Sequence, residues 1–217
     1  MLSSRFEFHC HSCFSQESWA TPEKIIQQCQ KNGIDGIALT DHNEITGAQE
    51  LKQNAPAWLK VVIGEEISTT EGEIIGLFLH TKINAGLSLS ETIQAIKKQG
   101  GLAILPHPFD RLRSKKLPLK NILKNIDSFD IIETFNGRTI WGADNKQAEN
   151  YAKQREKIRI SGSDAHFLSE YGKTLMHNID CSNPRLFMES LKKATATNRK
   201  TNIFFHVLTK LARFCKK

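Results

Sequence analysis

Short apolar runs alternate along the chain with longer segments in which apolar residues recur every three to four positions. The runs are rich in Ile, Val, Leu and Phe, a pattern that predicts β-strands. We expect seven strands, at residues 5–10, 34–40, 60–64, 73–79, 102–105, 130–135 and 158–161, and we consider an eighth at 174–179. The segments between them predict helices, and the last two expected helices cover 184–196 and 203–214. Thr21-Pro22 and Asn32-Gly33 mark the start and the end of the first helix.

The alternation of strands and helices predicts a mainly parallel sheet covered by helices, in the α/β class. About seven such units in one chain favour a closed or distorted TIM-like β/α barrel, and an open doubly wound sheet is the alternative. The chain has no Gly-x-Gly-x-x-Gly motif and no Gly-rich loop followed by Lys and Ser or Thr. Nucleotide-binding versions of the open sheet therefore lack support.

The composition is that of an ordinary globular domain. With 217 residues the chain suffices for one domain with a sizeable core, and 39% apolar and 24% charged residues fit a soluble protein. No apolar run approaches the ~20 residues of a transmembrane helix, and the first residues do not form a signal peptide. Cys10 and Cys13 are not followed by a second close pair of Cys or His, so we expect reduced thiols rather than a zinc finger. We expect a cytoplasmic protein without a transmembrane segment.

The formal net charge of +7 is concentrated near the C-terminus. From Lys192 onward the chain has eight Lys or Arg and no Asp or Glu, so the rest is close to neutral. We therefore divide the chain into a main domain, residues 1–182, and a helical, basic tail, residues 183–217. The apolar band at 203–214 predicts an amphipathic helix. It either packs on the barrel with a basic outer face or makes a weak contact with an anionic membrane or a nucleic acid.

Histidine and carboxylate side chains gather where the predicted strands end, which is where α/β barrels and open sheets form their active sites. His9 and His11 are two positions apart, so both imidazoles should point to the same side of a strand. The other such residues are Asp41, His42, Glu65, Glu66, Glu73, His107, Glu133, Asp164 and His166. The remaining histidines, His80, His177 and His206, lie elsewhere, and we expect no special role for them.

This mixture of histidine and carboxylate ligands predicts a metal site. Without a clear Cys ligand, it suits Zn, Mn or Fe, and the number of candidate ligands indicates more than one ion. Such ions lower the pKa of a bound water and hold phosphoryl oxygens. The sequence has neither a Ser-His-Asp arrangement nor a Cys nucleophile signature, so metal-activated water is the expected nucleophile.

From about Phe6 to Phe167, the chain resembles the PHP family, which is named for its polymerase-associated and histidinol-phosphatase members. The motifs are His9-Cys10-His11-Ser12, Ser15 to Ser18 before Thr21-Pro22-Glu23, Thr40-Asp41-His42-Asn43, Gly64-Glu65-Glu66-Ile67-Ser68, Pro106-His107-Pro108 and Gly162-Ser163-Asp164-Ala165-His166. The resemblance implies a distorted seven-stranded β/α barrel of the PHP type. It also implies two or three divalent metal ions and hydrolysis of a phosphate ester.

Residue by residue, the resemblance implies a set of metal ligands. They would be His9, His11, His42, Glu66, His107, Asp164 and His166. The family usually has an Asp soon after the first motif, and Glu17 is its substitute here. Many relatives have a His where Glu73 falls, so Glu73 is taken as a carboxylate replacement. Asp41 and Glu65 neighbour ligands and are expected to support them. Asp41 is also a candidate proton donor, and the alternatives are a ligand-adjacent His or a metal-bound water.

The family resemblance implies a small phosphorylated substrate, either a phosphomonoester or a nucleotide. An exonuclease acting on short oligonucleotides is the enzyme alternative, and a non-catalytic metal-binding regulatory domain is the alternative of another class. A phosphate ester needs cationic or amide donors beside the metals. Arg111, Asn136 and Arg138 are the candidates, whereas Arg113, Lys115 and Lys116 are expected to belong to a solvated loop.

Overall fold

The computed structural model describes residues 4–215, with side chains as far as residue 212. Its nine strands form one mixed sheet in the order β7-β6-β5-β4-β3-β2-β1-β8-β9. The strands are β1 (Arg5–Cys10), β2 (Gly36–Leu39), β3 (Lys60–Ser68), β4 (Glu73–Leu77), β5 (Leu102–Leu105), β6 (Ile131–Asn136), β7 (Ile158–Gly162), β8 (Leu175–His177) and β9 (Thr195–Thr197). The sheet is barrel-like and nearly closed, as expected for the α/β class.

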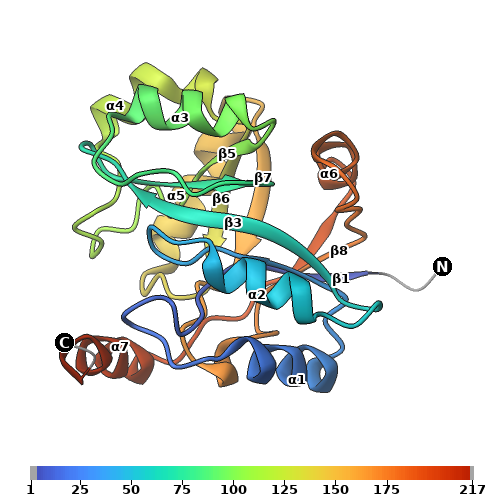
Figure 1. Ribbon diagram of the computed structural model, residues 1–217. Coiled ribbons are helices and arrows are strands. Elements are labelled where there is room, and N and C mark those ends of the chain that lie inside the picture. The colour runs from blue at the N-terminus through green and yellow to red at the C-terminus, as the bar shows by residue number, and fades with distance from the viewer. Residues whose placement is uncertain (1–3, 216–217) are drawn as a thin grey trace.

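Seven α-helices of the described residues surround the sheet (Figure 1). They are α1 (Pro22–Asn32), α2 (Thr46–Asn54), α3 (Leu89–Lys98), α4 (Leu119–Asn125), α5 (Gly142–Gln154), α6 (Pro184–Leu191) and α7 (Phe204–Cys215), with short 3-10 turns η1 (Ile126–Ser128) and η2 (Leu168–Glu170). Thr21 caps α1 by accepting a hydrogen bond from the Lys24 amide, and Gly33 ends it in a left-handed conformation, as predicted. Among these helices, none is both long and apolar enough to cross a membrane.

The strand count and directions differ from the expectation. The structure has nine strands rather than seven, because β8 forms and β9 occupies the end of a segment that we predicted as helix. The pairs β3-β4, β4-β5, β1-β8 and β8-β9 are antiparallel, so the sheet is mixed rather than mainly parallel. The turn between β3 and β4 is closed by a hydrogen bond from the Thr69 amide to the Gly72 carbonyl. A connection this short can only join antiparallel strands.

The segment after β7 returns to β1 and brings the first and last motifs together. The Ser163 amide donates to the Phe8 carbonyl at 3.0 Å, and the His11 amide donates to the Ala165 carbonyl at 2.8 Å. These two bonds nearly close the sheet at the end where the polar motifs lie. Residues 9–11 and 164–166, more than 150 positions apart, therefore become neighbours.

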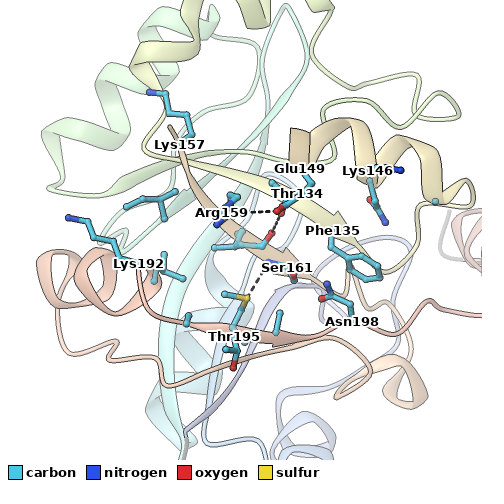
Figure 2. A pocket seen from close by; sticks show the side chains of 18 of the residues that line it. Thr134, Phe135, Lys146, Glu149, Lys157, Arg159, Ser161, Lys192, Thr195 and Asn198 are labelled. Atoms are coloured by element: carbon cyan, nitrogen blue, oxygen red, sulfur yellow. Dashed lines mark hydrogen bonds and ion pairs between the residues drawn. The ribbon is translucent and has the colours of Figure 1, made fainter. Parts of the chain in front are cut away.

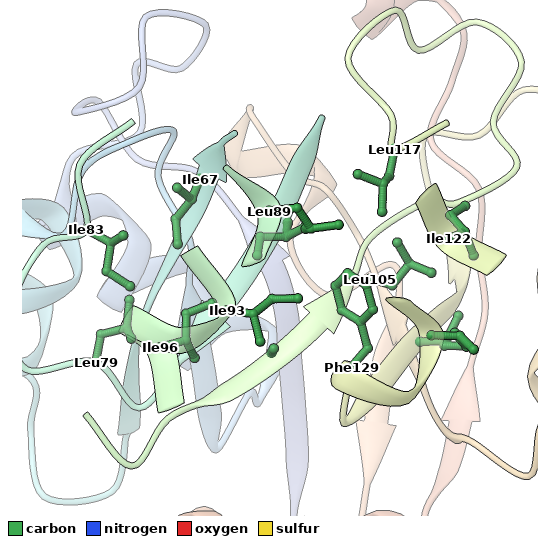
Figure 3. Packing of buried hydrophobic residues seen from close by; sticks show 14 of the residues in the cluster. Ile67, Leu79, Ile83, Leu89, Ile93, Ile96, Leu105, Leu117, Ile122 and Phe129 are labelled. Carbon is green, nitrogen blue, oxygen red and sulfur yellow. The ribbon is translucent and has the colours of Figure 1, made fainter. Parts of the chain in front are cut away.

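Apolar side chains fill the barrel and the layer beneath the helices. Inside the sheet, the rings of Phe6, Phe8 and Phe187 pack together, with centroids 4.6 to 6.3 Å apart, and Phe187 comes from α6. On the outer side, Figure 3 shows Ile93 of α3 and Leu105 of β5 in a second cluster. The apolar filling leaves one end of the barrel for polar side chains.

Candidate metal centre

The seven side chains expected to bind metal converge at that polar end of the barrel. Their ligand atoms form three groups, within each of which all atoms lie less than 4.8 Å apart. The groups are His9–Glu66–His107, His9–His11–Asp164 and His11–His42–His166. Because neighbouring groups share His9 or His11, they form one continuous cluster. The structure therefore brings together all seven residues that match ligand positions of the family.

The Glu66 carboxylate lies at the middle of the cluster and is fully buried. One oxygen, Oε1, lies 3.1 Å from His107 Nε2. The other, Oε2, lies 3.3 Å from His9 Nε2, 3.4 Å from His11 Nε2 and 3.2 Å from His42 Nδ1. Glu66 would therefore hold divalent cations together with these four histidines.

The backbone at three of these ligands adopts an unusual conformation. His9, His107 and Asp164 have φ values of 52°, 29° and 55°, in the left-handed region that non-glycine residues seldom occupy. At His9 the pairing of β1 with β2 is irregular. The imidazoles of His9 and His11 do share one space, as we predicted. The cause, however, is this irregularity and not the regular strand alternation from which we had argued. Such conformations cluster at functional sites, where the surrounding structure holds them in place.

Glu133 supports the cluster from outside, and the sequence motifs did not single it out as a functional residue. Its Oε1 lies 2.9 Å from His9 Nδ1, and because a carboxylate only accepts, His9 donates from Nδ1 and keeps Nε2 for a metal. Its Oε2 accepts from the His107 amide at 2.7 Å and from Asn136 Nδ2 at 3.1 Å. The only signal in the sequence was an acidic residue at the end of an apolar strand.

Asp41 fixes the loop that follows β1. Its carboxylate accepts hydrogen bonds from the Ser12 amide at 2.7 Å, the Ser12 hydroxyl at 2.6 Å and the Ser15 hydroxyl at 2.6 Å. Ser15 Oγ in turn accepts from the His42 amide at 3.1 Å. Both Asp41 oxygens are thus engaged by the loop, and these contacts favour a positioning role over the predicted role as proton donor.

The two acidic substitutes lie beside His42. Glu17 Oε1 is 4.0 Å from His42 Nε2, and Glu73 Oε1 is 3.9 Å from His42 Nδ1. Glu73 Oε1 also lies 3.3 Å from Lys115 Nζ. Both carboxylates are therefore close to the group His11–His42–His166.

Burial and neighbouring charges set the protonation states of the cluster. Burial, together with nearby cationic groups, lowers the pKa of His11, His107 and His166. Burial would also lower the pKa of His9, but Glu133 and Glu66 outweigh it and raise that pKa to about 9. Burial would raise the pKa of Glu66, but His42 and His9 hold it well below its usual value. Neutral imidazoles at His11, His107 and His166 beside an ionised Glu66 suit metal binding, and a metal bound at His9 Nε2 would displace a proton from that ring.

Several polar atoms of the cluster are buried without a hydrogen-bond partner in the described part of the chain. They are His107 Nδ1 and three atoms that face other ligands of the cluster, His11 Nε2, His42 Nδ1 and Asp164 Oδ1. Leaving such atoms unsatisfied typically costs about 1–3 kcal/mol each, and metal coordination would satisfy the three that face other ligands. The residues present therefore fit divalent ions bound by nitrogen and oxygen.

A hollow of about 370 Å³ opens above the cluster and is partly formed by the C-terminal helix. His42, Glu73 and His166 line its floor side, and α7 contributes His206, Thr209 and Lys210. Burial, reinforced by nearby arginines, lowers the pKa of His206 to about 4, so its imidazole is neutral near pH 7. The sequence pattern assigned no role to His206, because the docking of α7 is not visible in its motifs.

The arginines near the mouth differ from one another in their surroundings. Arg113, which we expected in a solvated loop, instead pairs with Asp164 and lines the hollow. Arg138 is buried, pairs with Glu170 at 3.2 Å, and donates to the Phe205 carbonyl at 3.0 Å.

The two remaining substrate-binding candidates have different surroundings. Arg111 is bound to Asp144 at 2.6 Å with its side chain more than half exposed, and Asn136 Nδ2 donates to Asp164 at 3.2 Å. Asn136 therefore lies beside Asp164, and Arg138 lines the hollow together with Arg113, whereas Arg111 does not. The contacts of Arg138 with Glu170 and Phe205 also hold α7.

A second cleft, of about 780 Å³, lies between α5, β7 and β9 (Figure 2). Figure 2 shows Lys157, Arg159 and Lys192 around it, with Arg159 paired to Glu149. None of the predicted metal ligands lines this cleft. A substrate would therefore reach the cluster through the smaller hollow, which His42 and His166 line.

Comparisons with known proteins agree with this geometry. The family model of the PHP domain matches residues 7–201. Two uncharacterized proteins of Methanocaldococcus jannaschii are similar, one 53% identical over 43% of this chain and 55% of its own length, the other 35% identical over 88% and 80%. A two-domain Bacteroides vulgatus protein containing a predicted PHP-like metal-dependent phosphoesterase has the same fold, with a TM-score of 0.72 at 19% identity, over 91% of this chain and 65% of that one.

Proposed function

The chain belongs to the PHP domain family, and we propose that it hydrolyses a phosphate ester with the help of two or three divalent metal ions, Zn, Mn or Fe. The observation that carries the proposal is the convergence of five histidines, Glu66 and Asp164 on one buried cluster. When bound there, such ions would polarise a phosphoryl oxygen and lower the pKa of a water nucleophile.

The residues around the cluster support this chemistry in distinct ways. Glu133 and the Asp164 carbonyl orient His9 and His166 by accepting from their Nδ1 atoms. Asp41 holds the loop that carries His11. These contacts fix the ligand directions before a metal or a substrate arrives, which reduces the reorganisation needed at the moment of reaction.

The mouth supports a small, anionic substrate. Arg113, Lys115 and Lys210 line a hollow of about 370 Å³, which is at the lower end of the size of small-molecule sites. Cationic side chains at this position would bind phosphate oxygens. We therefore favour a small phosphomonoester or a nucleotide over a long nucleic acid, which would need an extended basic groove leading to the cluster.

The test is phosphate release from a panel of phosphomonoesters, nucleotides and short oligonucleotides, with added manganese or zinc. The proposal predicts metal-dependent turnover that is lost in His9→Ala, with small substrates preferred. Preference for oligonucleotides would select the exonuclease alternative. Absence of turnover on the whole panel, from protein shown to contain its metals, would overturn the enzyme proposal in favour of a metal-binding regulatory domain.

A further inference from the structure

The C-terminal helix α7 presents its apolar side to solvent. Ile203, just before the helix, and Phe204, Val207 and Leu211 within it are each between 53% and 62% exposed. Spacings of three and four residues place them in one stripe. A helix packed on a globular domain normally buries its apolar stripe, whereas α7 turns its stripe toward solvent.

The inner side of α7 is held by polar contacts. The buried Arg138 donates to the Phe205 carbonyl and to the Thr209 hydroxyl, and Ala212 is fully buried. The helix is thus docked on the domain, as one of our two expectations had it, but its outer face is apolar rather than simply basic. Figure 1 shows α7 at the margin of the molecule. Tight polar anchoring of the inner side keeps the apolar stripe outward.

Two half-buried rings, Phe205 and Phe167, connect the stripe to the exposed Trp19 beyond the helix. The rings of Phe204 and Phe205 lie 6.4 Å apart, and Phe205 contacts Phe167 at 5.4 Å. Phe167 in turn contacts Trp19 at 6.0 Å, and Trp19 is exposed. Tryptophan and phenylalanine beside an apolar helix face are typical of surfaces that enter the boundary between lipid headgroups and acyl chains.

The end of the sequence, which includes α7, carries only positive charges. From residue 190 to the end, the sequence contains no acidic residue and the following cations: Lys192, Lys193, Arg199, Lys200, Lys210, Arg213, Lys216 and Lys217. Lys210 is exposed on α7, next to the apolar stripe. Positive charge beside an apolar face complements an anionic lipid surface, where each Lys or Arg adds to the attraction.

We propose that α7 and its flanking aromatic residues dock the protein on an anionic lipid surface, with Ile203, Phe204, Val207 and Leu211 inserted among the headgroups. The proposal concerns this outer face and does not depend on the chemistry of the cluster. Because Thr209 and Lys210 of the same helix line the mouth, docking would place the mouth beside the lipid surface.

A second copy of the chain fits the face less well. A stable protein interface typically involves about 20–30 residues on each partner, and the exposed apolar stripe has four. In a two-fold dimer the same patch would also meet itself, and its cations would face one another.

A nucleic acid also fits the stripe poorly. Single-stranded nucleic acids bind through aromatic rings that stack on bases, together with cations. Three of the four stripe residues, Ile203, Val207 and Leu211, are aliphatic and have no ring to stack. Lipid is the occupant that uses both the aliphatic stripe and the positive charge.

The test is co-sedimentation of the full chain with vesicles of phosphatidylcholine alone and of equal parts phosphatidylcholine and phosphatidylglycerol. We expect binding to the anionic vesicles only, weakened by salt, and at least about tenfold weaker binding for Val207→Asp/Leu211→Asp. The matched control is Leu119→Asp/Leu123→Asp, which changes two exposed leucines at α4 and should bind like the wild type. Circular dichroism verifies that each variant is folded.

A further variant separates insertion from simple charge attraction. Val207→Lys/Leu211→Lys removes the apolar side chains but adds positive charge, so insertion predicts weaker binding than wild type. Equal or tighter binding by this variant would overturn the proposal, as would absence of binding by the wild type. Sedimentation equilibrium without vesicles provides a last check, because a dimer dissociated by Val207→Asp/Leu211→Asp would assign the face to a second copy instead. All of these experiments measure binding or association, so their results are independent of phosphoesterase activity.

Discussion

Replacing Glu133 with glutamine tests whether the support behind the metal ligands matters. The carboxylate accepts from His9 Nδ1 through one oxygen and from the His107 amide through the other. A glutamine can keep only one of these acceptors. If its oxygen faces the His107 amide, its NH2 group faces His9 and drives the ring to the tautomer with a proton on Nε2, the atom aimed at Glu66.

The opposite orientation of the amide is no better. Its oxygen would then accept from His9, but its NH2 group would face the amide hydrogen of His107, and two donors opposed in a buried site cost about 1–3 kcal/mol. Loss of such a support typically weakens metal binding by about 10–100-fold. At 1.4 kcal/mol per factor of ten, that loss is about 1.4–2.8 kcal/mol of binding free energy.

The assay is competition for manganese or zinc between the protein and a chelating dye, at constant pH. Glu149→Gln is the control, because it makes the same substitution in a partly exposed ion pair with Arg159, at the cleft without ligands. We expect the control to bind metal like the wild type. A folded Glu133→Gln protein with metal affinity within about twofold of wild type would refute the supporting role.

Three further predictions concern stability and the mouth of the site. Arg138→Met leaves Glu170 buried and unpaired, so the free energy of unfolding in urea should fall by about 3–5 kcal/mol. Lys210→Ala should raise KM for a substrate with a second phosphate severalfold and leave kcat unchanged in steady-state kinetics, because Lys210 lines the mouth and not the cluster. Burial raises the pKa of Glu7 from 4.5 to about 8, so the folded protein holds a proton that the unfolded chain releases. The contribution of this bound proton to the free energy of unfolding is full below pH 4.5 and is lost as the pH rises to about 8. In urea unfolding, Glu7→Gln should therefore lose less free energy of unfolding over that range than the wild type.

The convergence of the ligands could be predicted because it depends on a general property of α/β sheets. Strands that run in parallel end at the same side, so His42 and His107, which follow β2 and β5, had to meet. The arrangement at His9 could not be predicted, because the sequence shows a regular strand whereas the structure has a left-handed residue in an irregular pair. Glu133 lies in none of the sequence motifs, and it supports the cluster through its contact with His9, 124 residues away in the sequence.

The features that could not be predicted depend on packing between distant segments. β9 has three residues, Thr195–Thr197, which is too few to show a period of two, and it exists because it pairs with β8. For α7 the sequence shows which residues share a face but not which face meets the domain. The buried Arg138 determines this orientation, because it is paired with Glu170 and its guanidinium donates to the backbone of α7.

The central claim is that one cluster centred on Glu66 holds two or three divalent ions. The most direct measurement is the metal content of the protein, by mass spectrometry after loading with manganese or zinc and removal of free ions, for wild type and Glu66→Gln. The account predicts at least two ions per wild-type chain, and a loss of at least one in Glu66→Gln, because this carboxylate contacts His9, His11, His42 and His107. A wild-type chain that retains no ion, or a folded Glu66→Gln variant that retains as many as the wild type, would contradict it.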